Sequence, residues 1–254
     1  MINIQFDKLA TLDEFIHLFD SIKPEFYDFG CSKGGSMLLA QRVFAQGNKT
    51  GIGIDISHEK VNLAKAAGLM AIAFDILDIP PDRKVKFTIM SEFLEHVNDF
   101  NDVKRFIRKA CDVSTDFIFI KQPYFDADGY LFRLGLKCFW SHWTGHPNTM
   151  STLDLYRILK ELKNNGIIGK FSIHVKHPVL NSSDPVIIPL ESKIDQHHYD
   201  SVIHPPKKKK IKFKFPVYQQ TVVFITMPGV EHGLLLKKYE VDETIIDENE
   251  KIIF

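Results

Sequence analysis

Three acidic residues, spaced 27 and 20 residues apart, accompany short apolar runs in the first third of the sequence. Asp28 precedes the glycines Gly30 and Gly34, and Asp55 and Asp75 end two later apolar runs. A glycine turn between a strand and a helix lets the backbone approach a nucleotide. An acid at the end of the next strand can accept hydrogen bonds from both ribose hydroxyls. The pattern predicts a nucleotide-type ligand at the carboxyl ends of several strands.

The glycine turn departs from two common nucleotide-binding motifs. Gly30 and Gly35 have the spacing of a P-loop, but Ser36 and Met37 follow them in place of the lysine and hydroxyl residue. Triphosphate binding is therefore poorly supported. Ser32 occupies the position of the second glycine in the dinucleotide fingerprint, which disfavours a pyrophosphate without excluding NAD. The alternative to a ligand-binding turn is one that only connects the strand to the helix.

The spacing of Asp28, Gly30 and Gly34 resembles the first motif of class I S-adenosylmethionine-dependent methyltransferases, with Ser32 replacing the middle glycine. The stretch FTIMSEFLEHVND, residues 87–99, resembles the end of the fourth strand in small-molecule and glycan methyltransferases that carry LEHV. The resemblance extends over about residues 25–228. It implies S-adenosyl-L-methionine as the cofactor.

The resemblance also implies which residues hold that cofactor. Asp28 and the glycine turn would lie near the methionine end, Asp55 would bind the ribose and Asp75 the adenine amino group. The complete set of predicted cofactor-binding residues is Asp28, Gly30, Ser32, Gly34, Asp55, Ile56, Asp75, Ile76, Ser91 and Glu92. Methyl transfer is an in-line displacement on an activated sulfonium, so alignment of the acceptor contributes most of the rate.

Three histidines are candidate catalytic residues. His96 follows the apolar run 85–90, and His142 and His146 lie in the aromatic segment 123–148, where the resemblance places acceptor-binding residues. An imidazole suits a general base at neutral pH if the acceptor is a hydroxyl or an acidic N–H group. The competing interpretation is that these histidines serve packing and hydrogen bonding.

The sequence predicts no metal site and no disulfide framework. Neither H-E-x-x-H nor C-x-x-C occurs, and the three cysteines are widely spaced. Glu92, Glu95 and Asp99 crowd a single turn, which gives no assignable ligand set. Free cysteines of this kind are typical of a reducing cytoplasm.

The elements that position these residues follow from an alternation of short apolar runs and amphipathic stretches over residues 26–120. This alternation predicts a parallel sheet with right-handed crossovers. Two later runs, 167–175 and 219–227, fit the antiparallel hairpin that the resemblance implies. We predict an α/β fold with a Rossmann-like, seven-stranded, mostly parallel sheet, an antiparallel C-terminal hairpin and helices on both faces. The predicted organisation is one domain at 1–229, with an insertion at 177–216 between the last two strands, and an acidic tail at 230–254.

The charge and composition of the chain argue against some classes of binding partner. The formal net charge is zero, which argues against a protein built mainly to hold nucleic acid. SEFL at 91–94 stands where DNA N-methyltransferases carry a Pro-Pro motif, so DNA is disfavoured. No run approaches the roughly 18 apolar residues of a membrane span. Lysines alternate with apolar residues at 210–215, which predicts a solvated edge strand or a surface for an anionic acceptor such as a sugar phosphate.

The sequence therefore predicts a cytoplasmic S-adenosylmethionine-dependent methyltransferase. Its acceptor would be an oxygen or nitrogen of a small molecule or glycan, in the style of bacterial surface-polysaccharide modification. One alternative is a nicotinamide-dependent oxidoreductase, although the Y-x-x-x-K pair of the sequence, Tyr156 and Lys160, lies on a late predicted helix. The other is a non-catalytic protein that binds a nucleotide-type ligand. An oligomer is compatible with the sequence.

Overall fold

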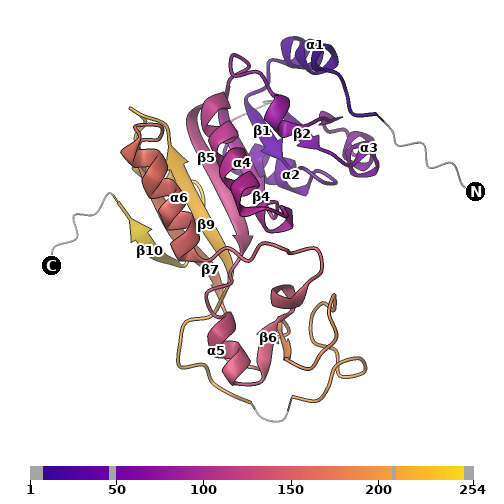
Figure 1. Cartoon of the computed structure of the whole chain (residues 1–254), viewed down its shortest axis with the longest axis vertical. Helices are drawn as coiled ribbons and strands as arrows, with labels where there is room; N and C mark the ends of the chain where they lie inside the picture. Colours follow the sequence, from indigo (N-terminus) through magenta and orange to yellow (C-terminus); the bar gives the residue numbers. More distant parts are fainter. Residues whose placement is uncertain (1–7, 46–49, 208–209, 249–254) are drawn as a thin grey trace, which may run out of the picture.

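The computed structural model describes residues 8–45, 50–207 and 210–248, and an eight-stranded sheet forms its centre (Figure 1). The strand order is β10-β7-β9-β5-β4-β1-β2-β3. From β3 to β5 all neighbours are parallel, whereas β9 is antiparallel to both β5 and β7. The predicted Rossmann-like sheet with an antiparallel C-terminal hairpin is confirmed. The strands of this sheet are β1 (Phe26–Phe29), β2 (Gly51–Asp55), β3 (Ala71–Ala73), β4 (Val85–Ser91), β5 (Ser114–Pro123), β7 (Phe171–Pro178), β9 (Tyr218–Thr226) and β10 (Glu243–Asp247).

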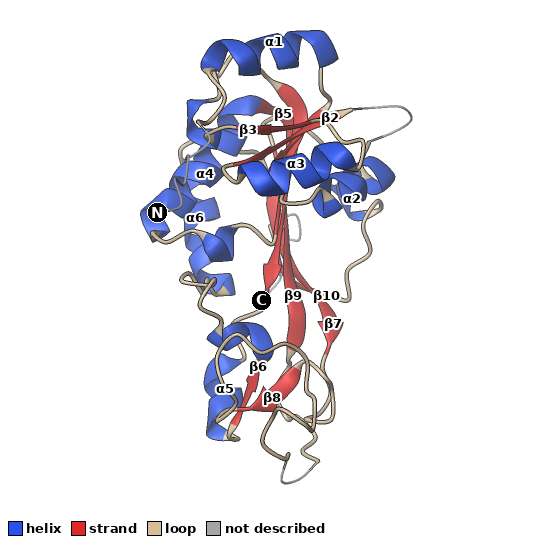
Figure 2. Cartoon of the chain, turned by 90° about the vertical axis from the view of Figure 1, so that its right-hand side faces the viewer, coloured by secondary structure: helices blue, strands red, loops and turns tan. Residues whose placement is uncertain are grey.

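Helices cover both faces of the sheet (Figure 2), and the hydrophobic side chains divide into two cores. Helices α1, α4 and α6 pack on the face to which Tyr27 and Phe29 contribute, and α2 and α3 pack on the face of Phe26. Because side chains alternate along a strand, Asp28 points to the same face as Phe26, toward α2. The longer helices are α1 (Leu12–Ile22), α2 (Gly35–Val43), α3 (His58–Ala66), α4 (Phe100–Val113) and α6 (Thr152–Asn164). Among the residues that the structure describes, no helix is both long and apolar enough to span a bilayer.

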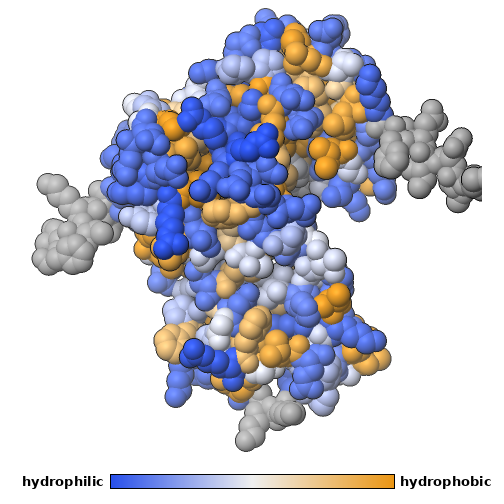
Figure 3. Space-filling view, in the orientation of Figure 1, coloured by the Kyte–Doolittle hydropathy of each residue, from blue (hydrophilic) through white to orange (hydrophobic). Residues whose placement is uncertain are grey.

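A smaller lobe lies beyond the carboxyl end of β5 (Figures 1 and 3). It combines the segment after β5 with the predicted insertion between β7 and β9, and the two segments share a hydrophobic cluster that includes Tyr124, Trp140 and Ile187. The lobe therefore stands at the edge of the sheet where open α/β proteins bind ligands. Its elements are α5 (Asp128–Arg133), β6 (Leu136–Cys138), the 3-10 turn η3 (Phe139–His142) and β8 (Ile187–Pro189), with β6 and β8 paired antiparallel.

The acidic tail contributes a strand that the sequence did not indicate. After the short helix α7 (Gly233–Leu236), β10 pairs antiparallel with β7 and becomes the eighth strand of the sheet. Ile246 packs against the α1–α4–α6 core, and the carboxylate of Glu248 pairs with the ammonium groups of Lys160 and Lys163 on α6. These contacts dock the tail at the sheet edge.

The alternating segment 210–215 does not form the predicted edge strand. It makes one isolated bridge, between Asn181 and Lys212. Side-chain contacts hold this segment in place of a ladder of strand hydrogen bonds. The ring of Tyr130 contacts the rings of Phe213 and Phe215, and the Tyr130 hydroxyl accepts the Lys214 N–H at 2.9 Å.

Candidate functional site

The glycine turn at 30–34 joins β1 to α2 and is closely packed. Gly30 has a φ of +72°, and a Cβ atom there would lie 2.3 Å from Cδ2 of Phe93. Gly34 has a φ of +91°, and its Cβ would lie 2.1 Å from Cδ1 of Leu69. At both positions a side chain would be strained by the positive φ and would require Phe93 or Leu69 to move. The turn thus contacts the residues that follow β4 and those that precede β3.

Asp55, at the end of β2, holds the turn in place. Its Oδ2 accepts the N–H of Ser32 at 2.9 Å, and its Oδ1 accepts the N–H of Ser57 at 2.9 Å. Ser32 has a φ of +47°, in the left-handed region that glycine adopts more readily. Each carboxylate oxygen retains a further lone pair for a ligand hydroxyl. Asp55 can therefore order the turn and bind a ribose at once.

Asp28 is the most deeply enclosed of the predicted cofactor residues. Its exposed fraction is 0%, and its Oδ2 accepts the Ser36 hydroxyl at 2.5 Å. Its Oδ1 is buried and has no hydrogen-bond partner among the described residues. Burial, opposed by the Ser36 hydrogen bond and aided by the charge of Asp55, raises the pKa of Asp28 to about 8. An orphaned carboxylate oxygen beside the glycine turn fits a cationic donor such as the ammonium group of a methionine moiety.

The residues at the end of β3 form a capped turn. Asp75 Oδ1 accepts the N–H of Leu77 at 2.8 Å and starts the 3-10 turn η1 (Ile76–Asp78). Ile76 is buried, whereas Ile56, just past β2, is 71% exposed. Such an exposed apolar side chain beside Asp55 is available to contact a ring or sugar face of a ligand.

The end of β4 carries the last two predicted cofactor residues. Ser91 is buried, and Glu92 adopts a φ of +53°. The Glu92 N–H donates to the carbonyl of Lys121 at 2.8 Å, and its Oε1 lies 3.2 Å from the Lys121 ammonium. The Glu92 side chain is thus held toward β5 by an ion pair.

The structure brings two of the three candidate histidines together. The rings of His96 and His146 are 4.8 Å apart between centroids. His96 Nδ1 lies 2.6 Å from the carbonyl oxygen of Gly145, and His146 Nδ1 lies 3.0 Å from that of Trp140. A carbonyl only accepts, so each Nδ1 carries a proton, and in the neutral form of each ring Nε2 keeps the lone pair. Burial lowers the pKa of His146, which favours its neutral form.

His142 stands apart from this pair. Its Nδ1 lies 3.0 Å from the ammonium nitrogen of Lys137, which also donates to the carbonyl of Ser192 at 2.6 Å. Lys137 is fully buried, so His142 accepts from a buried cation inside the smaller lobe.

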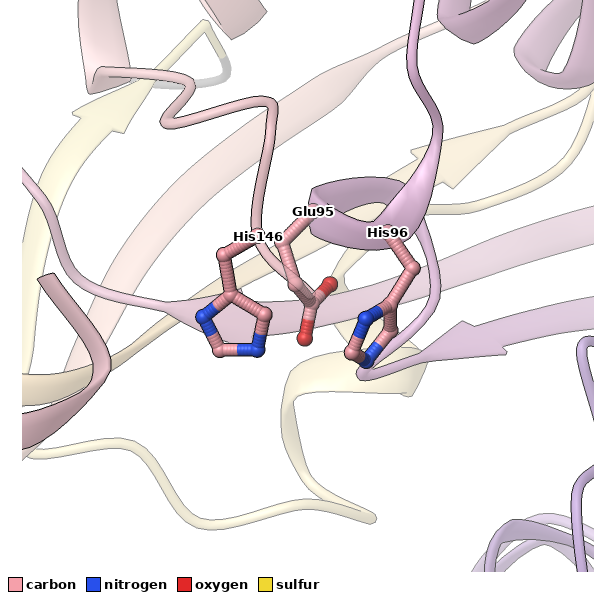
Figure 4. A group of neighbouring side chains, drawn as sticks. All are labelled: Glu95, His96 and His146. Atoms are coloured by element: carbon pink, nitrogen blue, oxygen red, sulfur yellow. The ribbon is translucent and has the colours of Figure 1, made fainter. Parts of the chain in front are cut away.

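Glu95 completes a cluster with His96 and His146 that the sequence analysis did not assemble. The three residues offer ligand atoms that all lie within 4.8 Å of one another, and Figure 4 shows the Glu95 carboxylate between the two rings. Glu95 is 1% exposed, and neither of its oxygens has a hydrogen-bond partner among the described residues. Burial, the nearby charge of Glu92 and the close approach of the Glu92 carboxyl group raise the pKa of Glu95 well above its ordinary value, which favours the protonated acid in the absence of a counter-charge.

The sequence signal for this cluster was incomplete. Glu95 and His96 lie on the 3-10 turn η2 (Leu94–His96) directly after β4, whereas His146 comes from the smaller lobe 50 residues later. An acid next to a histidine at a strand end could have drawn attention to the pair. The third member requires the tertiary structure.

One segment of the chain, from β1 to the start of β5, matches a family model. Residues 27–115 match the family model described as "Methyltransferase domain". This segment contains the glycine turn, the three strand-end acids and the LEHV turn. No curated protein matches the chain in sequence.

Several solved structures are similar at low identity. One is the magnesium protoporphyrin IX methyltransferase of Synechocystis PCC 6803 with bound SAM, at 14% identity and a TM-score of 0.44, covering 85% of this chain and 77% of that one. Another is the YcgJ protein of Bacillus subtilis, at 12% identity and a TM-score of 0.49, covering 87% and 100%. A third is the plantazolicin methyltransferase BpumL in complex with SAH, at 13% identity and a TM-score of 0.49, covering 83% and 80%. At these scores they say nothing about the acceptor.

Proposed function

We propose that this chain, whose residues 27–115 match the family model described as "Methyltransferase domain", is a class I S-adenosylmethionine-dependent methyltransferase. We propose further that it transfers the methyl group to an oxygen or nitrogen of a small-molecule or glycan-type acceptor. The observation that carries the cofactor assignment is the orphaned Oδ1 of buried Asp28 beside the glycine turn. An ammonium group of the cofactor supplies the donor that this oxygen lacks.

The proposed cofactor site runs along the carboxyl ends of β1 to β4. Asp28 and the turn hold the methionine end, and Asp55 binds the ribose hydroxyls. Asp75 and Ile76 take the adenine, and the exposed Ile56 covers a face of the nucleoside. Ser91 and Glu92 close the methionine side from β4. Bound S-adenosylmethionine supplies the activated methyl group.

The proposed acceptor site lies where the smaller lobe meets the end of β4. The cluster of Glu95, His96 and His146 is made from both parts. This cluster can assist the loss of a proton from an acceptor hydroxyl or N–H group, either with an imidazole as the base or through an ion bound by the cluster. His142 is tied to Lys137, and we assign it a structural part in shaping the lobe.

We propose a hydroxylated acceptor of the sugar-phosphate or glycan type, in bacterial surface-polysaccharide modification and in the cytoplasm. Support comes from the sequence resemblance and from the exposed lysines Lys210 and Lys214 on the smaller lobe, which attract anionic groups. An anionic acceptor predicts that methyl transfer weakens as salt concentration rises.

Calorimetry with S-adenosylhomocysteine tests the cofactor assignment. We expect the wild type to bind it and Asp28→Asn to bind it about 10- to 100-fold more weakly, since a hydrogen bond to a charged group contributes about 1.5–3 kcal/mol. Asp78→Asn, an exposed acid close to Asp75, is the matched control and should bind as the wild type does. Absence of binding to the wild type, or equal binding by Asp28→Asn, contradicts the assignment.

The acceptor is tested by following S-adenosylhomocysteine release over a panel of hydroxylated small molecules, sugar phosphates and nucleotide-linked sugars. Turnover on a sugar-type member supports the proposal. Saturable quenching of NADPH fluorescence with no methyl transfer points instead to a nicotinamide enzyme. Cofactor binding without turnover on any acceptor points to a binding protein.

A further inference from the structure

We propose that Glu95, His96 and His146 bind a divalent transition-metal cation at the carboxyl end of β4. These residues come from two parts of the chain, the turn after β4 and the smaller lobe, and converge on one point (Figure 4). Their ligand atoms lie within 4.8 Å of one another. Ligands at about 2.0–2.2 Å from a shared cation are separated by at most about 4 Å. Small side-chain rotations therefore close the site around an ion.

The two histidines are oriented as metal ligands usually are. A ligating histidine commonly donates its second ring N–H to a backbone carbonyl, which fixes the tautomer and the ring. His96 makes that hydrogen bond to Gly145 at 2.6 Å, and His146 makes it to Trp140 at 3.0 Å. Both Nε2 lone pairs are left for a cation.

Glu95 provides the second, independent observation. It is 1% exposed, and both of its oxygens are buried without hydrogen-bond partners among the described residues. Keeping such a buried carboxyl group ionised without a counter-charge costs several kcal/mol. Lys121, the nearby ammonium, pairs with Glu92 at 3.2 Å. A bound cation is the compensating charge that suits the geometry around Glu95.

The donor set selects the class of ion. Two imidazole nitrogens and one carboxylate oxygen suit Zn²⁺, Mn²⁺, Fe²⁺ or Co²⁺, whereas Ca²⁺ and Mg²⁺ prefer all-oxygen sites. Three protein ligands leave coordination positions open, as in catalytic rather than structural sites. An ion held by these three residues therefore keeps coordination positions for a further ligand, such as the methyl acceptor.

The role of the ion rests on the proposed function. An acceptor hydroxyl that binds at an open position loses its proton to solvent more readily, because the cation lowers its pKa. Its oxygen then forms the bond to the methyl carbon as the carbon–sulfur bond breaks, and that electron pair stays on sulfur. The products are the methyl ether, S-adenosylhomocysteine and one proton.

Cation uptake by the full chain tests the site without any acceptor. Chelator-treated protein is titrated with Co²⁺, and the visible d–d absorption and calorimetric stoichiometry are recorded. We expect stoichiometric binding by the wild type. The affinity for Co²⁺ should fall in Glu95→Gln and in His146→Ala. The fall should exceed the roughly 10- to 100-fold loss that follows mutation of a residue that only orients a metal ligand. His17→Ala, an exposed histidine on α1, is the matched control and should bind as the wild type does.

Circular dichroism and S-adenosylhomocysteine binding show whether each variant is folded. Glu95→Gln is nearly isosteric, so it keeps the test valid if His146→Ala does not fold. No uptake by the wild type, or equal uptake by folded Glu95→Gln, overturns the proposal. Cation binding without methyl transfer to any acceptor leaves the site standing and rejects the acceptor assignment alone.

Discussion

Replacement of Asp28 by asparagine should stabilise the free protein in a pH-dependent way. Burial raises the pKa of Asp28 to about 8 from an ordinary value of 3.8. Between these two values the folded chain holds a proton that the unfolded chain has released. The wild type therefore loses stability as pH rises through this window. The loss of stability is complete above the pKa that Asp28 has in the folded chain, and it is absent below the pKa that Asp28 has in the unfolded chain.

The size of the effect follows from linkage. One pKa unit corresponds to about 1.36 kcal/mol, so the stability lost between about pH 5 and pH 8 is on the order of 4 kcal/mol. Asparagine keeps an acceptor for the Ser36 hydroxyl and does not ionise. The stability of Asp28→Asn relative to wild type should therefore increase steadily with pH over this range.

Urea unfolding at several pH values, followed by circular dichroism, measures this difference. Asp78→Asn is the control, because Asp78 is exposed and should show no such trend. A difference between Asp28→Asn and wild type that is constant from pH 5 to pH 8 would refute the reasoning. The same variant should bind S-adenosylhomocysteine more weakly, so its stability and its cofactor affinity should change in opposite directions.

Three further substitutions probe the turn and the docked tail. Gly30→Ala places a methyl group 2.3 Å from Phe93 and should cost about 1–3 kcal/mol, whereas Gly35→Ala, with nothing within 4 Å, should have little effect on the melting temperature. Ser32→Gly should raise the free energy of unfolding, measured by urea denaturation, by up to about 1 kcal/mol, because glycine adopts the positive φ of 47° with less strain than serine. Glu248→Gln should weaken the pairing of the tail with the two α6 lysines and increase hydrogen exchange in β10, with a cost below about 1 kcal/mol because the lysines are partly exposed.

A different result would contradict each of these three predictions. Equal melting temperatures for Gly30→Ala and Gly35→Ala would mean that the turn yields easily at Phe93. Destabilisation by Ser32→Gly would show that the serine side chain, rather than its N–H, supports the turn. Unchanged exchange in β10 after Glu248→Gln would mean that the ladder with β7 alone holds the tail.

The parts of this structure that sequence reasoning reached are those with a local signature. Asp28 lies within a short apolar run, Asp55 and Asp75 follow two others, and the parallel order of β1, β2 and β3 places the carboxyl ends of these strands along one edge. The glycines of the turn were identified because their spacing reflects a backbone constraint, now visible as the positive φ of Gly30 and Gly34.

The parts it did not reach depend on contacts between distant segments. β10 is a strand because β7, some 70 residues earlier, offers an open edge, and its own sequence is acidic and weakly patterned. Segment 210–215 has the alternation of a strand, but Tyr130 draws its aromatic side chains into packing that leaves one bridge. The approach of His146 to Glu95 has the same origin, since the loop that carries it folds back from the smaller lobe.

The two proposals have one physical basis. Asp28 and Glu95 are buried acids with orphaned oxygens, and they lie where β1 pairs with β4: Asp28 on β1 and Glu95 just past β4. Each destabilises the free chain, because burial without a counter-charge disfavours the ionised form. A ligand ammonium at Asp28 and a metal cation at Glu95 would each offset that cost on binding. The fold thus stores unfavourable electrostatic free energy at the points where cationic groups are expected, and converts it into affinity for them.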